Sequence, residues 1–405
     1  MRRVLATDLG IWPSITDMVK TADALYLSPE HRSRIAEYLL LYDQIIIPTG
    51  NFQIVPVLRL LLGDDVFIEL VTQRIIVFAR VNEWIGYGGN GAGVLFFQVT
   101  GNQINPADEK NNILHAFFKP IDEALEMLLR VSNPPSTDLR RNELQKLITD
   151  TTFQIPQGKL TCDLKEESYR DVLGSPYLRN MLSIRNTGRT LDQINNMAPT
   201  LFTICCPHNR NYAPDMIEVQ SVLQVVFENL LLGIGSETEC QEIVGDNSSL
   251  SVLQAKGQRL GLPAHGSKAF AQIQSISGIP DIGKAFSVGI LTSQELLDLR
   301  YSPHAKSLRD WFAKGRPGEE ENQTVRRFVE TIGKTHWSDR LPSKLFRFAA
   351  TNGAGLAGPI PGVLASLADT FVLNKWFPVK SPVLFLRQAK TIVVNNSPSI
   401  PKPKK

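Results

Sequence analysis

The residue types best suited to chemistry in this chain are two aspartates and a lysine near its middle. Asp150 is followed by Asp163 and Lys165, which are separated by one leucine. Two carboxylates can hold Mg²⁺ while a lysine stabilises the charge that develops on a phosphate. We expect a strand over 159–165, on which Asp163 and Lys165 share a face. The set predicts a metal-dependent nuclease-like enzyme as an alternative function, and the competing interpretation is a solvated surface charge pair.

Cysteine and histidine come close together once, in the segment 205–208 (CCPH). A structural zinc site takes four ligands, usually as two short-spaced pairs. The fold would have to supply Cys162 and Cys240 to complete such a set. The remaining histidines are isolated, and the sequence has no His-Glu-x-x-His pair. We therefore predict buried thiols, no metal ligands and no cofactor.

Two glycine-rich segments, 86–91 (GYGGNG) and 353–358 (GAGLAG), match the pattern G-x-G-x-x-G. Dinucleotide binding needs a strand before these glycines and a helix after them. A strand is expected directly after the first segment, and Pro359 and Pro361 follow the second. Neither segment ends in the Gly-Lys-Ser/Thr of a phosphate-binding loop. We interpret the first segment as a flexible turn and predict no nucleotide site.

The strongest signal in the sequence is an uneven distribution of charge. The whole chain has 43 Lys and Arg and 40 Asp and Glu. Residues 323–405 hold 13 of these cations and only 3 acids, a net charge of +10, which leaves −7 for residues 1–322. Such a split indicates an anionic partner for the basic part. The alternative is that the acidic part neutralises the basic part within one molecule, because charge alone does not specify a partner.

An uncharged window of 21 residues, 348–368, lies inside the basic region and contains four glycines and two prolines. Its length is close to that of a membrane span, which needs about 20 apolar residues. Glycine and proline weaken a helix, however, so a buried segment of the globular core is the competing interpretation. The flanking cations and an aromatic residue beyond the window are typical of a segment that contacts a membrane interface.

This interpretation assigns a role to two sets of side chains. The residues predicted to bind the anionic surface are Arg326, Arg327, Lys344, Arg347, Lys375 and Lys380. The residues predicted to contact the membrane are Phe348, Leu356, Ile360, Leu364, Phe371 and Trp376. No catalytic residue is assigned; the alternative enzyme would use Asp150, Asp163 and Lys165.

The elements that position these residues begin with an α/β arrangement. Ser28-Pro29 is a good helix start, and three isoleucines in 44–48 predict a strand buried on both faces. A helix from Asn51 and strands over 74–80 and 94–100 follow. Strands separated by helices predict a small, mostly parallel sheet.

The middle and C-terminal regions are predicted to be mainly α-helical. Pro120 must kink or divide a helical pattern over 108–131, and Thr292 and Glu295 form a capping box. Further helices are expected over 138–150 and behind Pro214. A further strand is expected over 200–206. The predicted domains are an α/β domain, 1–133; a mainly helical domain, 134–316; a basic C-terminal region with a glycine-rich apolar segment, 323–397; and a disordered basic tail, 398–405.

Composition narrows the class of protein. A mean hydropathy of −0.08 excludes a multi-span membrane protein, and four scattered cysteines favour a reducing compartment. Asp8 interrupts any signal-peptide run at the start. We therefore expect a cytoplasmic protein, peripheral to the inner face of the membrane where it docks.

The sequence thus favours a non-enzymatic intracellular protein whose basic C-terminal region docks on an anionic surface, chiefly a membrane. Its N-terminal part would bind or sense another component. Nucleic acid is the alternative anionic partner, although aromatic residues are not regularly interleaved with the cations there. A protein partner is a further candidate, and the oligomeric state is left open.

Overall fold

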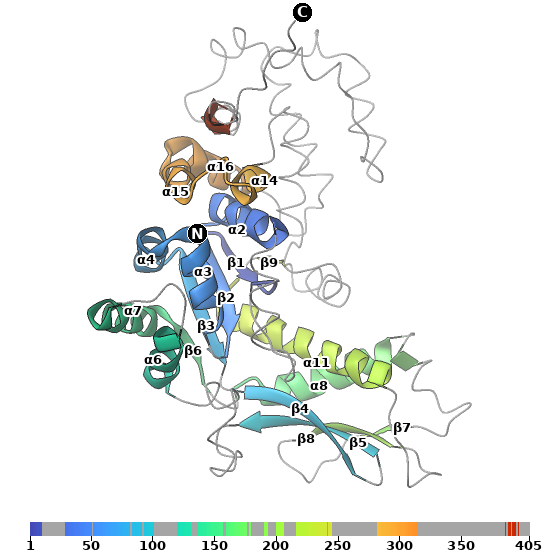
Figure 1. Ribbon diagram of the computed structural model, residues 1–405. Coiled ribbons are helices and arrows are strands. Elements are labelled where there is room, and N and C mark those ends of the chain that lie inside the picture. Colours follow the sequence, from blue (N-terminus) through green and yellow to red (C-terminus); the bar gives the residue numbers. More distant parts are fainter. Residues whose placement is uncertain are drawn as a thin grey trace, which may run out of the picture.

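The structure is a computed structural model. Figure 1 draws as ribbons the parts of the chain that it describes. The described residues are 1–9, 29–50, 52–81, 83–90, 93–100, 120–131, 137–156, 159–175, 178–179, 190–192, 200–205, 216–240, 242–244 and 282–313, and positions 385, 388–389, 391–393 and 396.

Parallel strands form the central sheet, in the order β6-β3-β2-β1-β9. The chain therefore adds strands on one side of β1 first and reaches its other side only with β9. The strands are β1 (Arg3–Ala6), β2 (Gln44–Thr49), β3 (Ile76–Val81), β6 (Phe153–Ile155) and β9 (Glu242–Val244). The small parallel sheet predicted for the N-terminal region is confirmed. Its strands β1, β6 and β9 were not predicted.

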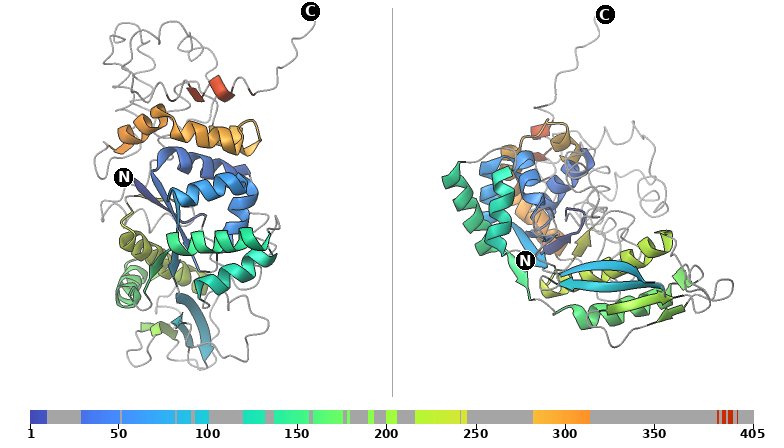
Figure 2. Two further views of the ribbon diagram at one scale, coloured as in Figure 1. Left: turned by 90° about the vertical axis from the view of Figure 1, so that its left-hand side faces the viewer. Right: turned by 60° about the horizontal axis from the view of Figure 1, so that its bottom comes forward.

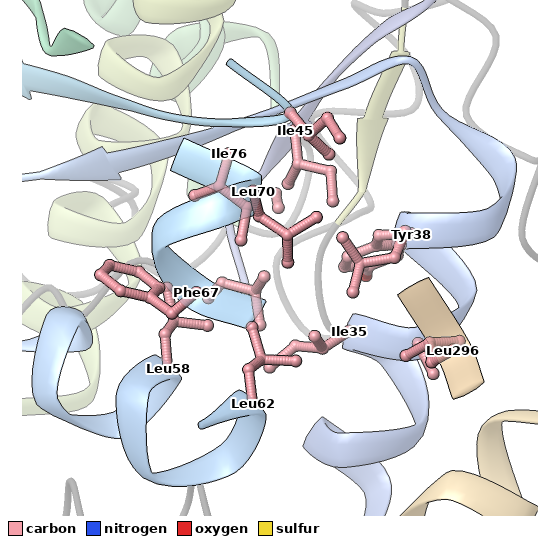
Figure 3. Packing of buried hydrophobic residues seen from close by; sticks show 14 of the residues in the cluster. Ile35, Tyr38, Ile45, Leu58, Leu62, Phe67, Leu70, Ile76 and Leu296 are labelled. Carbon is pink, nitrogen blue, oxygen red and sulfur yellow. The ribbon is translucent and has the colours of Figure 1, made fainter. Parts of the chain in front are cut away.

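One face of this sheet packs against a thick layer of helices (Figures 1 and 2). The helices next to the strands are α2 (Pro29–Leu41), α3 (Ile54–Leu62), α4 (Asp64–Thr72), α6 (Ile121–Val131) and α7 (Asp138–Thr151). Outside α2 lie α14 (Ile282–Ser287), α15 (Ser293–Tyr301) and α16 (Pro303–Ala313). Figure 3 shows the centre of this core, where Ile45 and Ile76 of the strands meet Phe67 and Leu70 of α4 and Tyr38 of α2.

The predicted helix beginning near Asn51 is two helices, α3 and α4. Gly63 separates them with φ 79°, a left-handed conformation that favours glycine. Asp64 and Asp65 then occupy the first turn of α4, where acidic side chains are favourable. The chain therefore turns at Gly63, which has no Cβ atom.

The opposite face of the central sheet packs against α11 (Met216–Glu237) and α8 (Thr161–Gly174). Alternate strand residues divide between the faces: Ile45 belongs to the first core and Ile46 to the second. A strand buried on both faces was predicted here and is confirmed. By length and composition α11 could cross a membrane, but 61% of the apolar window is buried inside the molecule.

A second, antiparallel sheet lies on the far side of α8 and α11, in the order β4-β5-β8-β7. Its strands are β4 (Glu83–Asn90), β5 (Gly93–Thr100), β7 (Thr190–Asp192) and β8 (Thr200–Cys205). The predicted strands over 94–100 and 200–206 exist, but the first joins this antiparallel sheet and not the parallel one. The flexible turn predicted over 86–91 is wrong, because residues up to Asn90 pair with β5 as a long hairpin.

The strand predicted over 159–165 is also wrong, because α8 begins at Thr161. Helical spacing buries Leu164, Ser168 and Val172, and Arg170 pairs with the glutamates three and four residues before it. Of the helical pattern predicted over 108–131, the part after Pro120 is confirmed as α6, and 108–119 lies outside the described residues. The predicted helices α7 and α11 occupy their expected places. The capping box at α15 is present as predicted.

Three buried arginines, two of them from the outer helices, donate hydrogen bonds to the end of α2. Arg300 donates to the carbonyl oxygens of Leu39, Tyr42 and Asp43. Arg309 donates to Leu40 O at 3.4 Å, and Arg2 donates to Leu41 O at 3.3 Å. A helix leaves its last four carbonyls without partners inside the helix, so these guanidinium groups complete α2.

Residues close to the C-terminus pack into the same core as the N-terminal helices. Phe385, Ala389 and Val393 are buried in the cluster that contains α2 and α14–α16. Asn396 donates hydrogen bonds to Ile290 O at 3.2 Å and to Glu295 Oε1 at 2.7 Å. The chain therefore leaves the described region beside Phe312 and re-enters it at Phe385 in one buried cluster.

Candidate functional site

The strand order creates a switch point between β1 and β9. In open α/β sheets, ligands bind outside the carboxyl ends of the strands where the chain reverses its direction of winding. Here β2 lies on one side of β1 and β9 lies on the other. Thr7 links the end of β1 to β9, because its backbone N and its Oγ1 each donate a hydrogen bond to Val244 O at 2.9 Å.

Asp8 follows directly and is the central polar group of the site. Only 2% of its side chain is exposed. Its Oδ2 accepts a hydrogen bond from Arg34 Nη1 at 3.0 Å and another from the Tyr38 hydroxyl at 2.8 Å. Its Oδ1 is buried and has no hydrogen-bond partner among the described residues. A buried carboxylate oxygen without a partner is costly and needs an explanation, such as a bound group.

Helix α2 supplies both donors from one face. His31, Arg34 and Tyr38 are spaced by three and four residues, which places them in a row along the helix. His31 lies close enough to favour the charged form of Asp8. The helix thus presents a cationic and hydroxylic row to the carboxyl end of β1.

Burial dominates the electrostatics of this cluster. It raises the pKa of Asp8, and the charge of Arg34 and the Tyr38 hydrogen bond oppose this shift only in part. Burial and the neighbouring Asp8 carboxylate raise the pKa of Tyr38 well above its ordinary value, so this hydroxyl stays a donor. A ligand group that donates a hydrogen bond to Oδ1 would favour the ionised carboxylate.

The neighbouring strand ends complete this edge of the sheet. Phe52 has φ 60°, and its backbone N donates to Thr49 Oγ1 at 2.9 Å. Arg80, which is 2% exposed, donates to Gly50 O at 3.2 Å and lies over the Phe52 ring. Burial lowers the pKa of Arg80 to about 10. A cationic group therefore lies at the end of β3, two strands from Asp8.

A second feature, the amino-edge cavity, lies at the opposite edge of the same sheet. Its volume is about 380 Å³, which is within the range of about 300–1,000 Å³ that is usual for ligand pockets. Its lining comes from the first residues of the strands and from the ends of three helices. The lining residues are Arg3, Gln44, Ile46, Arg74, Val77, Asp150, Thr151, Thr152, Phe153, Glu237, Thr238 and Glu239.

The structure places the predicted nuclease residues on two different helices. Asp150 lies at the end of α7 and lines the amino-edge cavity, whereas Lys165 lies on α8 and does not line it. The side chain of Asp163 is outside the described residues. In a helix, residues two apart do not face each other, so the shared face expected for Asp163 and Lys165 is absent.

All twelve residues predicted to bind an anionic surface or to contact a membrane fall between 326 and 380, outside the described part of the chain. The candidate site therefore lies in the α/β layer, and the roles of those twelve residues stay predictions. The glycine-rich window 348–368 lies outside the described part as well.

The described cysteines favour a structural role. Cys240 is buried, and burial raises the pKa of its thiol to about 11, so it is a poor nucleophile and metal ligand. Cys205 is half-buried at the end of β8, whereas Cys206 and His208 are outside the described residues. Within the described part of the chain, no three His, Cys, Asp or Glu side chains form a metal-binding group.

The sequence analysis missed Asp8, Arg34 and Tyr38 as a group. The one available signal was the position of Asp8 after the short apolar run Val4–Ala6, which marks the end of a buried strand. That run is only three residues long, and the pairing of its strand with β9 joins positions more than 230 residues apart. No protein-family model, curated protein or solved structure matches this chain.

Proposed function

We propose that the chain is a non-enzymatic protein with two working parts, associated with the cytoplasmic face of a membrane. The α/β layer binds a ligand at the carboxyl edge of its parallel sheet, with Asp8 as the acceptor. The basic region docks on an anionic membrane surface. The observation that carries the docking proposal is the net charge of +10 on residues 323–405, against −7 on the remainder.

Three ion pairs in the described part of the chain join acids and cations of residues 1–322. Carboxylates of the first part pair with cations of the same part: Arg2 with Glu242, and Lys159 Nζ with Glu237 at 2.7 Å. Arg309 likewise pairs with Asp43 at 3.2 Å. These three acids are therefore engaged by cations from residues 1–322, in line with the proposal that the basic region meets an external anionic surface.

The two anchors of the basic region support the same proposal. Phe312 before it and Phe385 within it belong to one buried cluster with α14–α16. The residues between these anchors include all the proposed surface-binding positions. Asn396, which follows Phe385, also bonds to Ile290 O and Glu295 Oε1, so both attachment points lie beside the outer helices, which would orient the proposed docking region toward one surface.

The proposed division of labour follows the chemistry of the two residue sets. The six cations from Arg326 to Lys380 attract anionic headgroups, since each Lys or Arg near such a leaflet contributes about 1 kcal/mol. The apolar set from Phe348 to Trp376 then adds shallow contact with the acyl region.

Ligand binding at Asp8 is supported by the carboxylate oxygen that has no hydrogen-bond partner in the described part of the chain. Oδ1 is buried and has no partner in the described part of the chain, while Oδ2 has two donors. The ligand must therefore offer a hydroxyl or an N–H group at this point. The same carboxylate is held by α2, the helix against which the outer helices pack.

Vesicle co-sedimentation tests the docking half. The full chain should sediment with phosphatidylserine-containing vesicles and not with pure phosphatidylcholine vesicles. Replacement of the six cations Arg326, Arg327, Lys344, Arg347, Lys375 and Lys380 by glutamine should weaken binding at least about tenfold. The matched control removes six cations elsewhere by replacing Arg140, Lys146, Lys165, Arg170, Lys284 and Lys306 with glutamine.

The control variant loses the same total charge and should keep most of its vesicle binding. Equal recovery with neutral and anionic vesicles would overturn the proposal. Equal weakening by the two variants would also overturn it, because binding would then depend on total charge and not on the proposed region. Salt-dependent binding to DNA without vesicle binding would favour the nucleic-acid alternative.

A further inference from the structure

Most of the charged side chains that line the amino-edge cavity form ion pairs with other residues of the chain. Arg3 Nη1 lies 3.0 Å from Glu239 Oε2 and also donates to Thr238 O at 3.0 Å. Glu237 is paired with Lys159. Two charged lining residues, Arg74 and Asp150, have exposed side chains that form no ion pair among the residues that the structure describes. The cavity therefore offers one available cation and one available anion.

Arg74 is held in a backbone conformation that its residue type disfavours. Its φ of 54° is left-handed, and it follows the end of α4 at the position where glycine is usual. The turn is closed by hydrogen bonds from Arg74 N to Val71 O at 2.9 Å and from Ile75 N to Leu70 O at 2.8 Å. Gln44 Nε2 also donates to Arg74 O at 2.8 Å. An arginine is thus fixed where glycine would relieve strain, which favours a role for its side chain.

Asp150 lies in the last turn of α7, which ends at Thr151. The C-terminal end of a helix carries a partial negative charge, which adds to that of the carboxylate and favours a cation nearby. Thr151 Oγ1 and Thr152 Oγ1 bond to the carbonyls of Leu147 and Ile148, at 2.8 and 2.6 Å. These threonines complete the helix end, so Asp150 is the charged group it presents to the cavity.

The remaining wall is apolar. Ile46 and Val77 line the cavity from β2 and β3 and are 2% and 7% exposed. Phe153, at the start of edge strand β6, is 41% exposed. An apolar group of the ligand would cover part of this ring and gain burial.

We propose that the amino-edge cavity binds a free amino acid with an apolar side chain. Arg74 receives the ligand's carboxylate, because a guanidinium can form two parallel hydrogen bonds with it. Asp150 and the end of α7 receive the ammonium group. The apolar side chain lies against Phe153, Ile46 and Val77. This site is on the opposite edge of the sheet from Asp8 and is independent of the function proposed above.

Isothermal titration calorimetry on the full chain, with L-leucine as the probe, tests this site. We expect saturable binding of one L-leucine per chain. Two analogues each lack one charged group of L-leucine: 4-methylpentanoate lacks the ammonium group and 3-methylbutylamine lacks the carboxylate. Each should bind at least about tenfold more weakly, because each leaves one charged partner of the cavity unengaged.

Arg74→Gly separates binding from folding. It should abolish L-leucine binding while melting at the same temperature as the parent chain or higher, because it removes the left-handed arginine. Asp150→Asn should weaken binding at least about tenfold. Asp310→Asn, an exposed aspartate on α16 that does not line the cavity, is the matched control and should leave binding unchanged.

Three results would overturn the proposal. The first is the absence of saturable heat with L-leucine at millimolar concentration. The second is unchanged binding in Arg74→Gly, and the third is binding of 4-methylpentanoate as tight as that of L-leucine, which would reduce the cavity to an anion site. Asp8→Asn should leave L-leucine binding intact, so failure at one edge of the sheet is distinguishable from failure at the other.

Discussion

The Tyr38 hydroxyl donates a 2.8 Å hydrogen bond to Asp8 Oδ2 and thereby joins helix α2 to the carboxyl end of β1. Arg34 reaches the same oxygen from one turn earlier in the helix. Two donors converge on Oδ2, while Oδ1 is buried and has no hydrogen-bond partner among the described residues. This asymmetry is what a preorganised acceptor site requires, because the carboxylate is already oriented before a ligand arrives.

Asp8 should reduce stability at neutral pH. Its folded pKa is raised above its ordinary value of about 3.9, so the folded state holds the proton more tightly than the unfolded state. Its favourable contribution is complete below that ordinary value and is lost as pH rises through the folded pKa. Asp8→Asn should therefore melt at a higher temperature than the parent near neutral pH, and the difference should shrink as pH falls toward about 4.

Thermal melts across this pH range, with Asp310→Asn as the exposed control, check the expectation. A binding-site carboxylate that costs stability is the usual trade-off between function and stability. If Asp8→Asn melted below the parent at every pH, Asp8 would be a structural ion-pair partner of Arg34 and not an open acceptor.

Arg300 should be among the most important polar residues for stability. It donates to three carbonyls at and directly after the end of α2, and burial lowers its pKa to about 9. Arg300→Met would leave these carbonyls without donors and should lower the free energy of unfolding by about 3 kcal/mol. Arg300→Lys should recover only part of this loss, since one ammonium group cannot reproduce the planar fork.

Urea denaturation measures these differences, and Lys306→Met on the exposed side of α16 is the control. A loss below about 0.5 kcal/mol for Arg300→Met would contradict the assigned capping role, since that is the range of ordinary surface substitutions.

Gly283 should be intolerant of any side chain. A Cβ atom there would lie 2.2 Å from Ser33 Oγ and 2.8 Å from Ser33 O, because α14 packs closely on α2. Gly283→Ala should cost about 1–3 kcal/mol. Gly174, at the end of α8, has open space around the same position, so Gly174→Ala should be neutral or stabilising. Equal effects of the two substitutions on urea denaturation would contradict the close helix contact.

The contact between Glu295 and Asn396 should weaken in acid. Hydrogen bonds from the backbone N of Thr292 and from Asn396 lower the pKa of Glu295. The stability that these bonds contribute is present above the unfolded pKa of about 4.3 and is lost as pH falls through the folded pKa. The melting temperature of Glu295→Gln should thus lie below that of the parent at neutral pH and converge with it in acid. A constant difference at all pH values would exclude a role for this carboxylate's charge.

Local patterns predicted the parts of the fold that depend on local physics. The three consecutive isoleucines of β2 indicated a strand covered on both faces, and Thr292 with Glu295 indicated the start of α15. These features depend on neighbouring residues alone. The hairpin of β4 and β5 was mistaken for a turn, because its glycines weaken the strand signal while pairing along its whole length decides the structure.

The candidate site could not be read from the sequence for a different reason. Asp8, Arg34 and Tyr38 are each ordinary in isolation, and only the parallel pairing of β1 with β2 and β9 brings α2 over Asp8. The amino-edge cavity likewise joins the ends of α4, α7 and α11, so that Arg74 and Asp150 share one lining. Sequence spacing alone associated Asp150 with Lys165, which the helix α8 places elsewhere.

The most direct test of docking is hydrogen exchange over residues 348–376 of the full chain, with and without anionic vesicles. The proposed docking predicts that backbone amides in this segment exchange more slowly when phosphatidylserine-containing vesicles are added, and that pure phosphatidylcholine vesicles leave their rates unchanged. Amides that are already fully protected without lipid, or that never respond to it, would contradict the docking role.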